Sequence, residues 1–452
     1  MTPEIMTTIY LKPHKEESLK RFHPWVFSGA LSRVVLDTRH PGDAPEEGEL
    51  VCVRSAANEV LGIGHWQVGS IAVRILAFGV EDLPEGFWRE RIRAAYKVRQ
   101  AIGLVRVESQ KSKVESNNDT FRLVHGEGDF LPGLVVDVYA DTAVIQAHSV
   151  GMHVCRKEVA DAVVAEVPQV KNVYYKSDDT LPFKAAIEGE KVGYLIKNSK
   201  FKIQNSKFLS QGNDYSKIQN SKFLSQENDY SKIQNDEEFW STENGLQFRI
   251  DWLRGQKTGF FIDQRENRAL VERYAKGKDV LNMFCYTGGF SLYALRGGAK
   301  TVDSVDVSQK AIDLVNINVA KNFPNARNHT AVAADAFEYL SAQKSEGRTY
   351  DLIILDPPAF AKHRDAVKNA LRGYQRINTK AIEMIRPGGI LFTFSCSQAV
   401  DKEAFRLAVF SAAAQAGRNV RILHQLHQPQ DHPINIYHPE GEYLKGLILW
   451  IE

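Results

Sequence analysis

Residues 350–360, which read YDLIILDPPAF, decide the fold of the C-terminal half of this chain. A short apolar run that ends at Asp-Pro-Pro predicts a buried strand followed by a loop, because proline has no N–H group to offer a sheet. A second apolar run, FTFS at 392–395, follows after a stretch long enough for one helix and ends at Cys396. Strand, helix and strand in this order are typical of a parallel α/β unit. The sequence therefore predicts that Asp356 and Cys396 stand at neighbouring strand ends.

Three earlier strand patterns extend this α/β alternation back to about residue 241. The strand at 280–284 runs into a glycine turn, and the strands at 301–306 and near 333 end close to an aspartate. Because the carboxyl ends of parallel strands meet along one edge of a sheet, where such folds bind ligands, we expect one shared site there. The candidate residues at these strand ends are Gly288, Gly289, Asp306, Asp335, Asp356 and Cys396.

The glycine turn and the aspartates that follow it indicate a nucleotide-like ligand. Such a turn lets the backbone approach a nucleotide closely, although CYTGG at 285–289 is not the GxGxxG of dinucleotide sites. Asp306 stands about 20 residues further on, where a carboxylate accepts both ribose hydroxyls, and Asp335 offers an acceptor for an adenine amino group. Taken singly, Asp306 and Asp356 could be helix caps and Cys396 an inert buried thiol. Their common position at strand ends favours a ligand site.

The rest of the chain divides into two further predicted domains. Residues 1–80 read as short strands separated by turn residues, which predicts a small β-rich module. Residues 81–240 combine a basic helical stretch with alternating strand patterns at 134–139 and 143–146, which predicts an α+β central domain. The α/β domain then occupies 241–452.

A tandem repeat interrupts the central segment. The stretch FKIQNSKFLSQGNDY at 201–215 recurs almost unchanged at 216–230, and a third copy breaks off after a few residues. Two copies are too few for a stacked solenoid, and their lysines, glutamines and asparagines are typical of a solvated tract. We therefore interpret residues 199–235 as a surface insertion.

The composition excludes several classes of protein. The chain has 452 residues, 43% of them hydrophobic and 25% charged, and no apolar run reaches the roughly 18 residues that a membrane span requires. The N-terminal residues lack the apolar core of a secretion signal, so we expect a cytoplasmic protein. The 4 cysteines lie far apart, which argues against a disulfide framework and a paired-cysteine metal site.

Attraction to nucleic acid must come from local clusters, because the net charge is only +2. Residues 11–27 interleave cations with aromatic side chains. This pattern suits phosphate contacts and base stacking, but it is equally typical of a solvated face. The RNA-binding candidates are Lys12, Lys15, Arg21, His23 and Trp25.

Several stretches carry a family resemblance. They are LNMFCYTGGFSLYAL at 281–295, SVDVSQKAIDLVNINV at 304–319, LDPPAFAK at 355–362, RGYQRIN at 372–378 and FSCS at 394–397. They resemble the class I S-adenosylmethionine-dependent RNA methyltransferases, and specifically the bacterial 23S rRNA cytosine-C5 methyltransferase family that carries an N-terminal PUA domain. The stretches at 11–31, 126–137 and 255–268 are similar to that family's PUA opening, its central domain and the loop that leads into its catalytic domain.

The resemblance implies a Rossmann-like α/β domain with a mostly parallel seven-stranded sheet, preceded by a PUA-like domain and an α+β domain. It implies S-adenosyl-L-methionine as cofactor and 23S rRNA or a large-subunit assembly intermediate as partner, and it leaves a homodimer open. The expected donor contacts are Phe284, Cys285, Tyr286, Thr287, Gly288, Gly289, Asp306, Asp335 and Ala336, with Phe260, Asp263 and Gln264 closing over the donor.

Chemistry assigns the expected catalytic roles. Carbon 5 of a pyrimidine is a poor nucleophile, so we expect the Cys396 thiolate to add at carbon 6, after which carbon 5 can attack the activated methyl group. Asp356 is expected to hydrogen-bond the base edge and to stabilise the anionic intermediate. A base must then remove the carbon-5 proton, and His432, Asp356 and water are all candidates. No metal is required, and a base in folded rRNA must be splayed out of its stack to react.

Two alternatives remain open. N-methylation of guanine or adenine also uses Asp-Pro-Pro loops but needs no thiol, so Cys396 would then serve only in packing. A non-catalytic RNA-binding or assembly protein on the same scaffold is the second alternative, although the donor-site and nucleophile positions carry chemically competent residues. Binding of S-adenosylmethionine would separate this second alternative from both enzymes.

Overall fold

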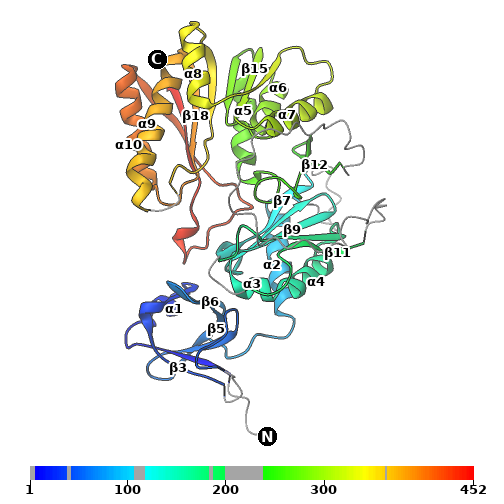
Figure 1. The fold of residues 1–452 in the computed structure, drawn as a ribbon, viewed down its shortest axis with the longest axis vertical. Helices are drawn as coiled ribbons and strands as arrows, with labels where there is room; N and C mark the ends of the chain where they lie inside the picture. The colour runs from blue at the N-terminus through cyan, green and yellow to red at the C-terminus, as the bar shows by residue number, and fades with distance from the viewer. Residues whose placement is uncertain (1–5, 38–41, 106–117, 183–186, 199–237, 362–363) are drawn as a thin grey trace, which may run out of the picture.

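Three large sheets and a two-stranded hairpin follow one another along the described part of the chain in the computed structural model (Figure 1). The structure describes residues 6–37, 42–105, 118–182, 187–198, 238–361 and 364–452. In the view of Figure 1 the N-terminal sheet lies at the bottom, the central sheet in the middle and the C-terminal sheet at the top. The tandem repeat at 199–235 lies outside the described residues. None of the described helices has the length and apolar character that a membrane crossing needs.

The N-terminal domain is a six-stranded sheet in the order β2-β6-β5-β4-β1-β3 with one short helix. Its elements are β1 (Thr8–Leu11), α1 (Glu17–Lys20), β2 (Trp25–Phe27), β3 (Leu31–Val35), β4 (Leu50–Arg54), β5 (Val60–Trp66) and β6 (Ile71–Phe78). Buried side chains such as Ile9, Val51 and Val73 form its core. The predicted strands of the β-rich module are present. The structure adds β1 and β2, which are too short to show an alternating pattern.

The central domain is a five-stranded sheet in the order β11-β10-β9-β8-β7. Its elements are α2 (Phe87–Ala101), β7 (Thr120–His125), β8 (Leu134–Tyr139), β9 (Thr142–Ala147), α3 (Val150–Val154), α4 (Arg156–Glu166), β10 (Asn172–Lys176) and β11 (Val192–Lys197). Helices α2 and α4 pack against each other, and Glu166 accepts hydrogen bonds from Arg89 and Arg93. A hairpin of β12 (Trp240–Glu243) and β13 (Leu246–Arg249) leads into the C-terminal domain.

The C-terminal domain has seven strands in the order β16-β15-β14-β17-β18-β20-β19, which confirms the predicted mostly parallel sheet. Strands β14 to β18 pair in parallel, and β20 is antiparallel to both of its neighbours. The strands are β14 (Asp279–Met283), β15 (Thr301–Asp306), β16 (His329–Ala333), β17 (Tyr350–Leu355), β18 (Ile385–Ser395), β19 (Val420–His427) and β20 (Lys445–Ile451). The strand order reverses between β14 and β17, the point at which open α/β sheets bind ligands.

Helices cover both faces of this sheet (Figure 1). They are α5 (Arg265–Ala275), α6 (Gly289–Arg296), α7 (Gln309–Asn322), α8 (Ala336–Ser345), α9 (Val367–Met384) and α10 (Lys402–Ala416). In Figure 1, α8, α9 and α10 lie on one side of the sheet, and α5, α6 and α7 lie on the other. Side chains of α8, α9 and α10 share one buried cluster with β17 and β18. The sheet is therefore buried on both faces, as its continuous apolar strands require.

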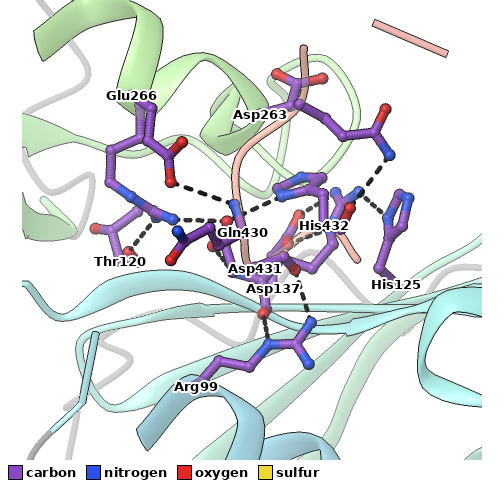
Figure 2. A network of polar contacts seen from close by, with 12 residues as sticks. Arg99, Thr120, His125, Asp137, Asp263, Glu266, Gln430, Asp431 and His432 are labelled. Atoms are coloured by element: carbon purple, nitrogen blue, oxygen red, sulfur yellow. Dashed lines mark hydrogen bonds and ion pairs between the residues drawn. The ribbon is translucent and has the colours of Figure 1, made fainter. Parts of the chain in front are cut away.

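Asp431, in the loop after β19, joins the central and C-terminal domains (Figure 2). Its carboxylate lies 2.6 Å from Nη2 of Arg265 in α5 and accepts the backbone N–H of Arg122 at 3.0 Å. Its backbone oxygen accepts a hydrogen bond of 2.6 Å from Arg99 in α2. All of these groups are shielded from water, so each charge depends on its partner.

The two central-domain arginines are paired in turn. Arg99 contacts both carboxylate oxygens of Asp129 at 2.5 and 2.8 Å, and Arg122 contacts both of Asp137 at 2.8 and 2.9 Å. Thr258 also donates to Asp137, at 2.6 Å. The network therefore continues from the central sheet into the loop that precedes α5.

A second interdomain contact, around Glu127, involves all three domains. Trp25 of β2 donates its indole N–H to Oε1 of Glu127 at 2.8 Å, and Asn435 donates to the backbone oxygen of Glu127 at 3.1 Å. Packing there leaves no room for a side chain at Gly128, because a Cβ would lie 1.9 Å from the backbone oxygen of Pro433. We call this contact of Trp25, Glu127, Gly128, Pro433 and Asn435 the three-domain junction.

We expect Asp431→Asn to lower the free energy of unfolding by about 3 kcal/mol, because it leaves the buried Arg265 guanidinium unpaired. Arg265 and His432 hold the pKa of Asp431 well below its usual range, against the opposing effect of burial. The stabilisation is therefore complete above about pH 4, the usual aspartate value, and is lost as the pH falls towards the folded pKa. Urea unfolding at pH 7 and below pH 4 measures both effects. Asp161→Asn, an exposed change in α4, is the control, and an equal effect of the two substitutions would contradict the prediction.

Candidate active site

A cleft of about 490 Å³ opens at the carboxyl ends of the parallel strands β14 to β18. The predicted residues that line it are Phe260, Asp263, Gln264, Phe284, Cys285, Tyr286, Thr287, Gly289, Asp306, Asp335, Ala336, Asp356 and Cys396. Gly288 belongs to the same turn but does not line the cleft. The structure thus brings the expected donor contacts and both expected catalytic residues into one cleft.

The turn after β14 has an unusual backbone. Phe284 and Tyr286 have positive φ angles of 58° and 47°, and Gly288 has one of 84°. Positive φ is costly for residues with a side chain and is concentrated at functional sites. Asn318 of α7 stabilises the turn by donating to the backbone oxygen of Thr287 at 2.9 Å. A Cβ at Gly289 would lie 3.0 Å from Cδ of Arg268, so glycine keeps the start of α6 close to that side chain.

Asp306, at the end of β15, organises the same turn. Its two carboxylate oxygens accept backbone N–H groups from Tyr286 at 2.9 Å and from Ser308 at 3.0 Å. The cap of the next helix is Ser308, whose hydroxyl accepts from the backbone N–H of Ala311. Asp306 is therefore a cleft residue that supports the turn, and not the cap of α7.

Asp335 is the N-cap of α8. Its Oδ1 accepts from the backbone N–H of Phe337 at 2.8 Å and of Glu338 at 3.1 Å. The capping alternative, which the sequence raised for Asp306 and Asp356, thus applies to Asp335. The residue still lines the cleft, so capping and ligand contact are compatible there.

The loop at 255–268 closes one side of the cleft. Asp263 is buried, and its Oδ2 accepts the phenolic hydroxyl of Tyr443 at 2.7 Å. Its Oδ1 has no hydrogen-bond partner among the described residues. Burial acts to raise the pKa of Asp263, but Lys257 and His432 outweigh it and lower the pKa, so the carboxylate is ionised. One oxygen of a buried, ionised side chain that lines the cleft is therefore unpaired among the described residues.

Asp356 and Cys396 occupy a poorly solvated part of the cleft. Burial, with a contribution from the Asp263 carboxylate, raises the pKa of Asp356 to about 7, and a hydrogen bond from Gln264 opposes the rise. Burial likewise raises the pKa of the Cys396 thiol to about 11, and Asp356 acts in the same direction while Lys257 opposes it. Near neutral pH the cleft thus holds a protonated thiol beside a carboxyl group that can carry or release a proton.

The other candidates from the sequence lie outside the cleft. His432 is buried in the interdomain network, where its Nδ1 lies 3.1 Å from Asp431, and it is not among the lining residues. Lys12, Lys15 and Arg21 are exposed on the N-terminal domain, whereas Trp25 belongs to the three-domain junction.

His23 belongs to the one group that offers metal-ligand geometry among the residues described. Donor atoms of His23, His438 and Glu440 all lie within 4.8 Å of one another. The group lies away from the cleft, and Glu440 is largely exposed.

Sequence reasoning missed several residues that shape the cleft. Lys257 and Arg268 line it, and Arg268 pairs with buried Glu243 at 2.7 Å. Both lie within the stretch at 255–268, so the family resemblance marked the segment without separating these cations from their neighbours. Tyr443 reaches Asp263 from the segment just before β20, and only the fold shows this contact because 180 residues separate the two in sequence.

Two family models match the chain. One, described as S-adenosylmethionine-dependent methyltransferase, matches residues 210–440, and one described as PUA-like domain matches residues 9–78. Among curated relatives, a protein of Shewanella frigidimarina called ribosomal RNA large subunit methyltransferase I is 36% identical over 97% of this chain and 98% of its own. A protein of Tolumonas auensis with the same name is 35% identical over 98% of this chain and 99% of its own.

Solved structures share the fold. A methyltransferase complexed with SAH has a TM-score of 0.73 at 21% identity and covers 98% of this chain and 99% of its own. A Streptococcus mutans protein described as a SAM-dependent methyltransferase has a TM-score of 0.72 at 20% identity, with the same coverage. These matches confirm the α/β architecture with its additional N-terminal domains.

We expect Asp356→Asn to speed alkylation of Cys396 by roughly threefold to tenfold at pH 8, because it removes a negative charge that raises the thiol pKa. The rate of iodoacetamide modification at this one cysteine, followed by peptide mass between pH 7 and 11, measures the shift. Asp335→Asn is a matched control, since Asp335 is a second cleft carboxylate and asparagine also caps helices well. An unchanged or raised midpoint in Asp356→Asn would count against the assigned charge.

Proposed function

The chain belongs to the family of S-adenosylmethionine-dependent methyltransferases that carry a PUA-like domain, and from this membership we propose that it methylates carbon 5 of a cytosine in 23S rRNA. The relatives named ribosomal RNA large subunit methyltransferase I support the choice of RNA. The observation that carries the position of methylation is the pair of Cys396 and Asp356 at the ends of adjacent strands in the cleft.

The cleft has the features that the methyl donor needs. The turn after β14 exposes backbone for a close approach, Asp306 provides a carboxylate for the ribose hydroxyls, and Asp335 lies where the next strand ends. Phe260 and Phe284 contribute apolar walls. When bound, the donor supplies an activated methyl group. We propose that these residues, with Asp263 and Gln264, hold it beside the reacting base.

The first catalytic step is addition of Cys396 to the base. Ionised Asp356 takes the thiol proton, and the sulfur forms a bond to carbon 6 of the cytosine. The electron pair of the carbon 5–carbon 6 double bond shifts through the ring to N3, which accepts the proton from Asp356. Carbon 5 is then an enamine carbon that can attack a methyl group. A carboxyl with a pKa of about 7 suits this role, because both of its forms are available at neutral pH.

The second step removes the carbon-5 proton and releases the enzyme. A base takes that proton, its electron pair re-forms the carbon 5–carbon 6 double bond, and the carbon–sulfur pair returns to Cys396. N3 releases the proton that it gained in the first step, and this proton restores the Cys396 thiol. We assign the base to Asp356, again ionised after it has given up its proton, in preference to His432, which does not line the cleft. Asp356 thus serves as proton carrier in both steps.

The N-terminal and central domains hold the RNA in this proposal. Lys12, Lys15 and Arg21 are exposed cations that suit phosphate contacts, and Phe22 and Phe27 beside them are 47% and 46% exposed. The substrate is 23S rRNA or an assembly intermediate in which the target cytosine is already out of its stack. N-methylation of guanine is the second candidate, favoured by the Asp-Pro-Pro loop alone, and it gives Cys396 no role.

We expect Cys396→Ala to abolish product while it leaves donor binding unchanged. Each protein is incubated with labelled S-adenosylmethionine and unmodified 23S rRNA, and the digested nucleosides are identified by mass. Wild type should yield 5-methylcytidine and the variant none, with a loss of at least about a thousandfold because no other route to a carbon-5 nucleophile exists. Methylguanosine from wild type, or full activity without the thiol, would refute the covalent mechanism.

We expect Asp306→Asn to weaken binding of S-adenosylmethionine about tenfold or more, because charge-assisted hydrogen bonds contribute about 1.5–3 kcal/mol each. Calorimetric titration with the donor or with S-adenosylhomocysteine gives the dissociation constant. Asp313→Asn, on the exposed face of α7, controls for the loss of one negative charge nearby. Equal affinities of wild type and Asp306→Asn would remove Asp306 from the donor site.

A further inference from the structure

Lys445, the first residue of β20, is a buried cation next to the turn that carries Cys396. The antiparallel register places Lys445 opposite Ser395, the residue that precedes Cys396. Its Nζ donates to the backbone oxygen of Ser397, the residue that follows Cys396, at 2.6 Å, and to the backbone oxygen of Tyr443 at 2.8 Å. The side chain is 7% exposed. The ammonium group therefore ties the backbone just after the thiol, at Ser397, to the backbone just before β20, at Tyr443.

Burying the ammonium group of a lysine in this position costs free energy. Removing an ammonium group from water carries a large penalty, which is normally offset by a carboxylate partner. Among the side chains that the structure describes, no carboxylate lies within 4.0 Å of Lys445 Nζ. Burial lowers the pKa of Lys445 to about 8, so it is mostly charged at neutral pH, and Cys396 opposes this lowering ahead of Asp401 and Glu442.

The cleft itself disfavours a thiolate at Cys396. Asp356 and Asp263 both act against ionisation of the thiol, and Lys257 is a cleft cation that favours it. Lys257 is 50% exposed, so water screens it, and it also lies 3.8 Å from Asp263. An enzyme that uses Cys396 as a nucleophile needs a second, less screened positive charge.

We propose that Lys445 is a positioning residue for Cys396, which holds the turn at 395–397 through the Ser397 carbonyl and favours the thiolate by its charge. The proposal rests on the function proposed above. Cys396 raises the pKa of Lys445, so the two groups are close enough to interact. Lys257 is the cation with the larger effect on the pKa of the thiol, and Lys445 adds to it only below about pH 8, where it is charged. The charge acts twice in the reaction. It stabilises the thiolate before the sulfur–carbon 6 bond forms, and it stabilises the same thiolate as leaving group when that bond breaks.

The pH dependence of Cys396 alkylation in the full-length protein tests the proposal. The rate of Cys396 alkylation is measured by peptide mass between pH 7 and 11 in wild type, Lys445→Met, Lys445→Arg and Lys402→Met. Thermal melting confirms that each variant is folded. Lys402 is a matched control, because it is a nearby but 55% exposed lysine that pairs with Glu442. If Lys445→Met does not fold, Lys445→Gln replaces it, because an amide N–H can still donate to the two carbonyls without a charge.

We expect alkylation of Cys396 in Lys445→Met to be about fivefold to tenfold slower at pH 7, where the wild-type ammonium is charged. The two proteins should converge above about pH 10, where Lys445 is neutral in wild type as well. Lys445→Arg should stay within about twofold of wild type, and Lys402→Met should match it. A wild-type alkylation rate at pH 7 in a folded, neutral Lys445 variant would overturn the proposal, as would an equal slowing in Lys402→Met. Alkylation requires neither RNA nor methyl donor, so its outcome is independent of which nucleoside wild type methylates.

Discussion

The parallel register of β14, β15, β17 and β18 is the constraint on which the cleft depends. Met283 pairs with Val305 and with Leu355, and Leu355 pairs with Thr393, so the four strands end at nearly the same level. The loops that follow these strands therefore lie side by side, although they are far apart in sequence. A slip of one residue in any pairing would turn the following side chains to the opposite face of the sheet. The chemistry of the cleft is thus set by backbone hydrogen bonds that contact no ligand.

The sequence predicted β14 to β18, because each is a short apolar run close to a glycine turn, an aspartate or the Cys396 position. It did not predict β19, which is largely exposed, or β20. Asp356 and Cys396 could be placed together for the same reason. The Asp431 network and the contacts of Lys445 could not be predicted. They join residues that are distant in the chain, and nothing in the local pattern distinguishes a buried lysine from an exposed one. The cap at Asp335 was missed because one aspartate can serve a helix and a cleft together.

Burial has opposite consequences for the two groups at the centre of the cleft. It moves Asp356 to a pKa near neutrality, where a carboxyl can exchange protons at little cost, but it moves Cys396 away from its reactive form. The same shortage of water that makes one residue a good proton carrier makes the other a reluctant nucleophile. A nearby cation can favour the Cys396 thiolate without bringing water back to Asp356, because its positive charge stabilises the thiolate directly. Lys257 provides such a charge from the surface and Lys445 from the interior.

The three-domain junction bears on the distance between the N-terminal domain and the cleft. Trp25 of the N-terminal domain and Asn435 of the C-terminal domain both bind Glu127, and Gly128 packs directly on Pro433, so the three domains share one contact region. An RNA gripped by the N-terminal domain would present only nucleotides at one set distance and direction to Cys396. Selection among the many identical bases of a ribosome would then follow from spacing along the folded RNA, and the cleft itself would need only to distinguish one kind of base from another.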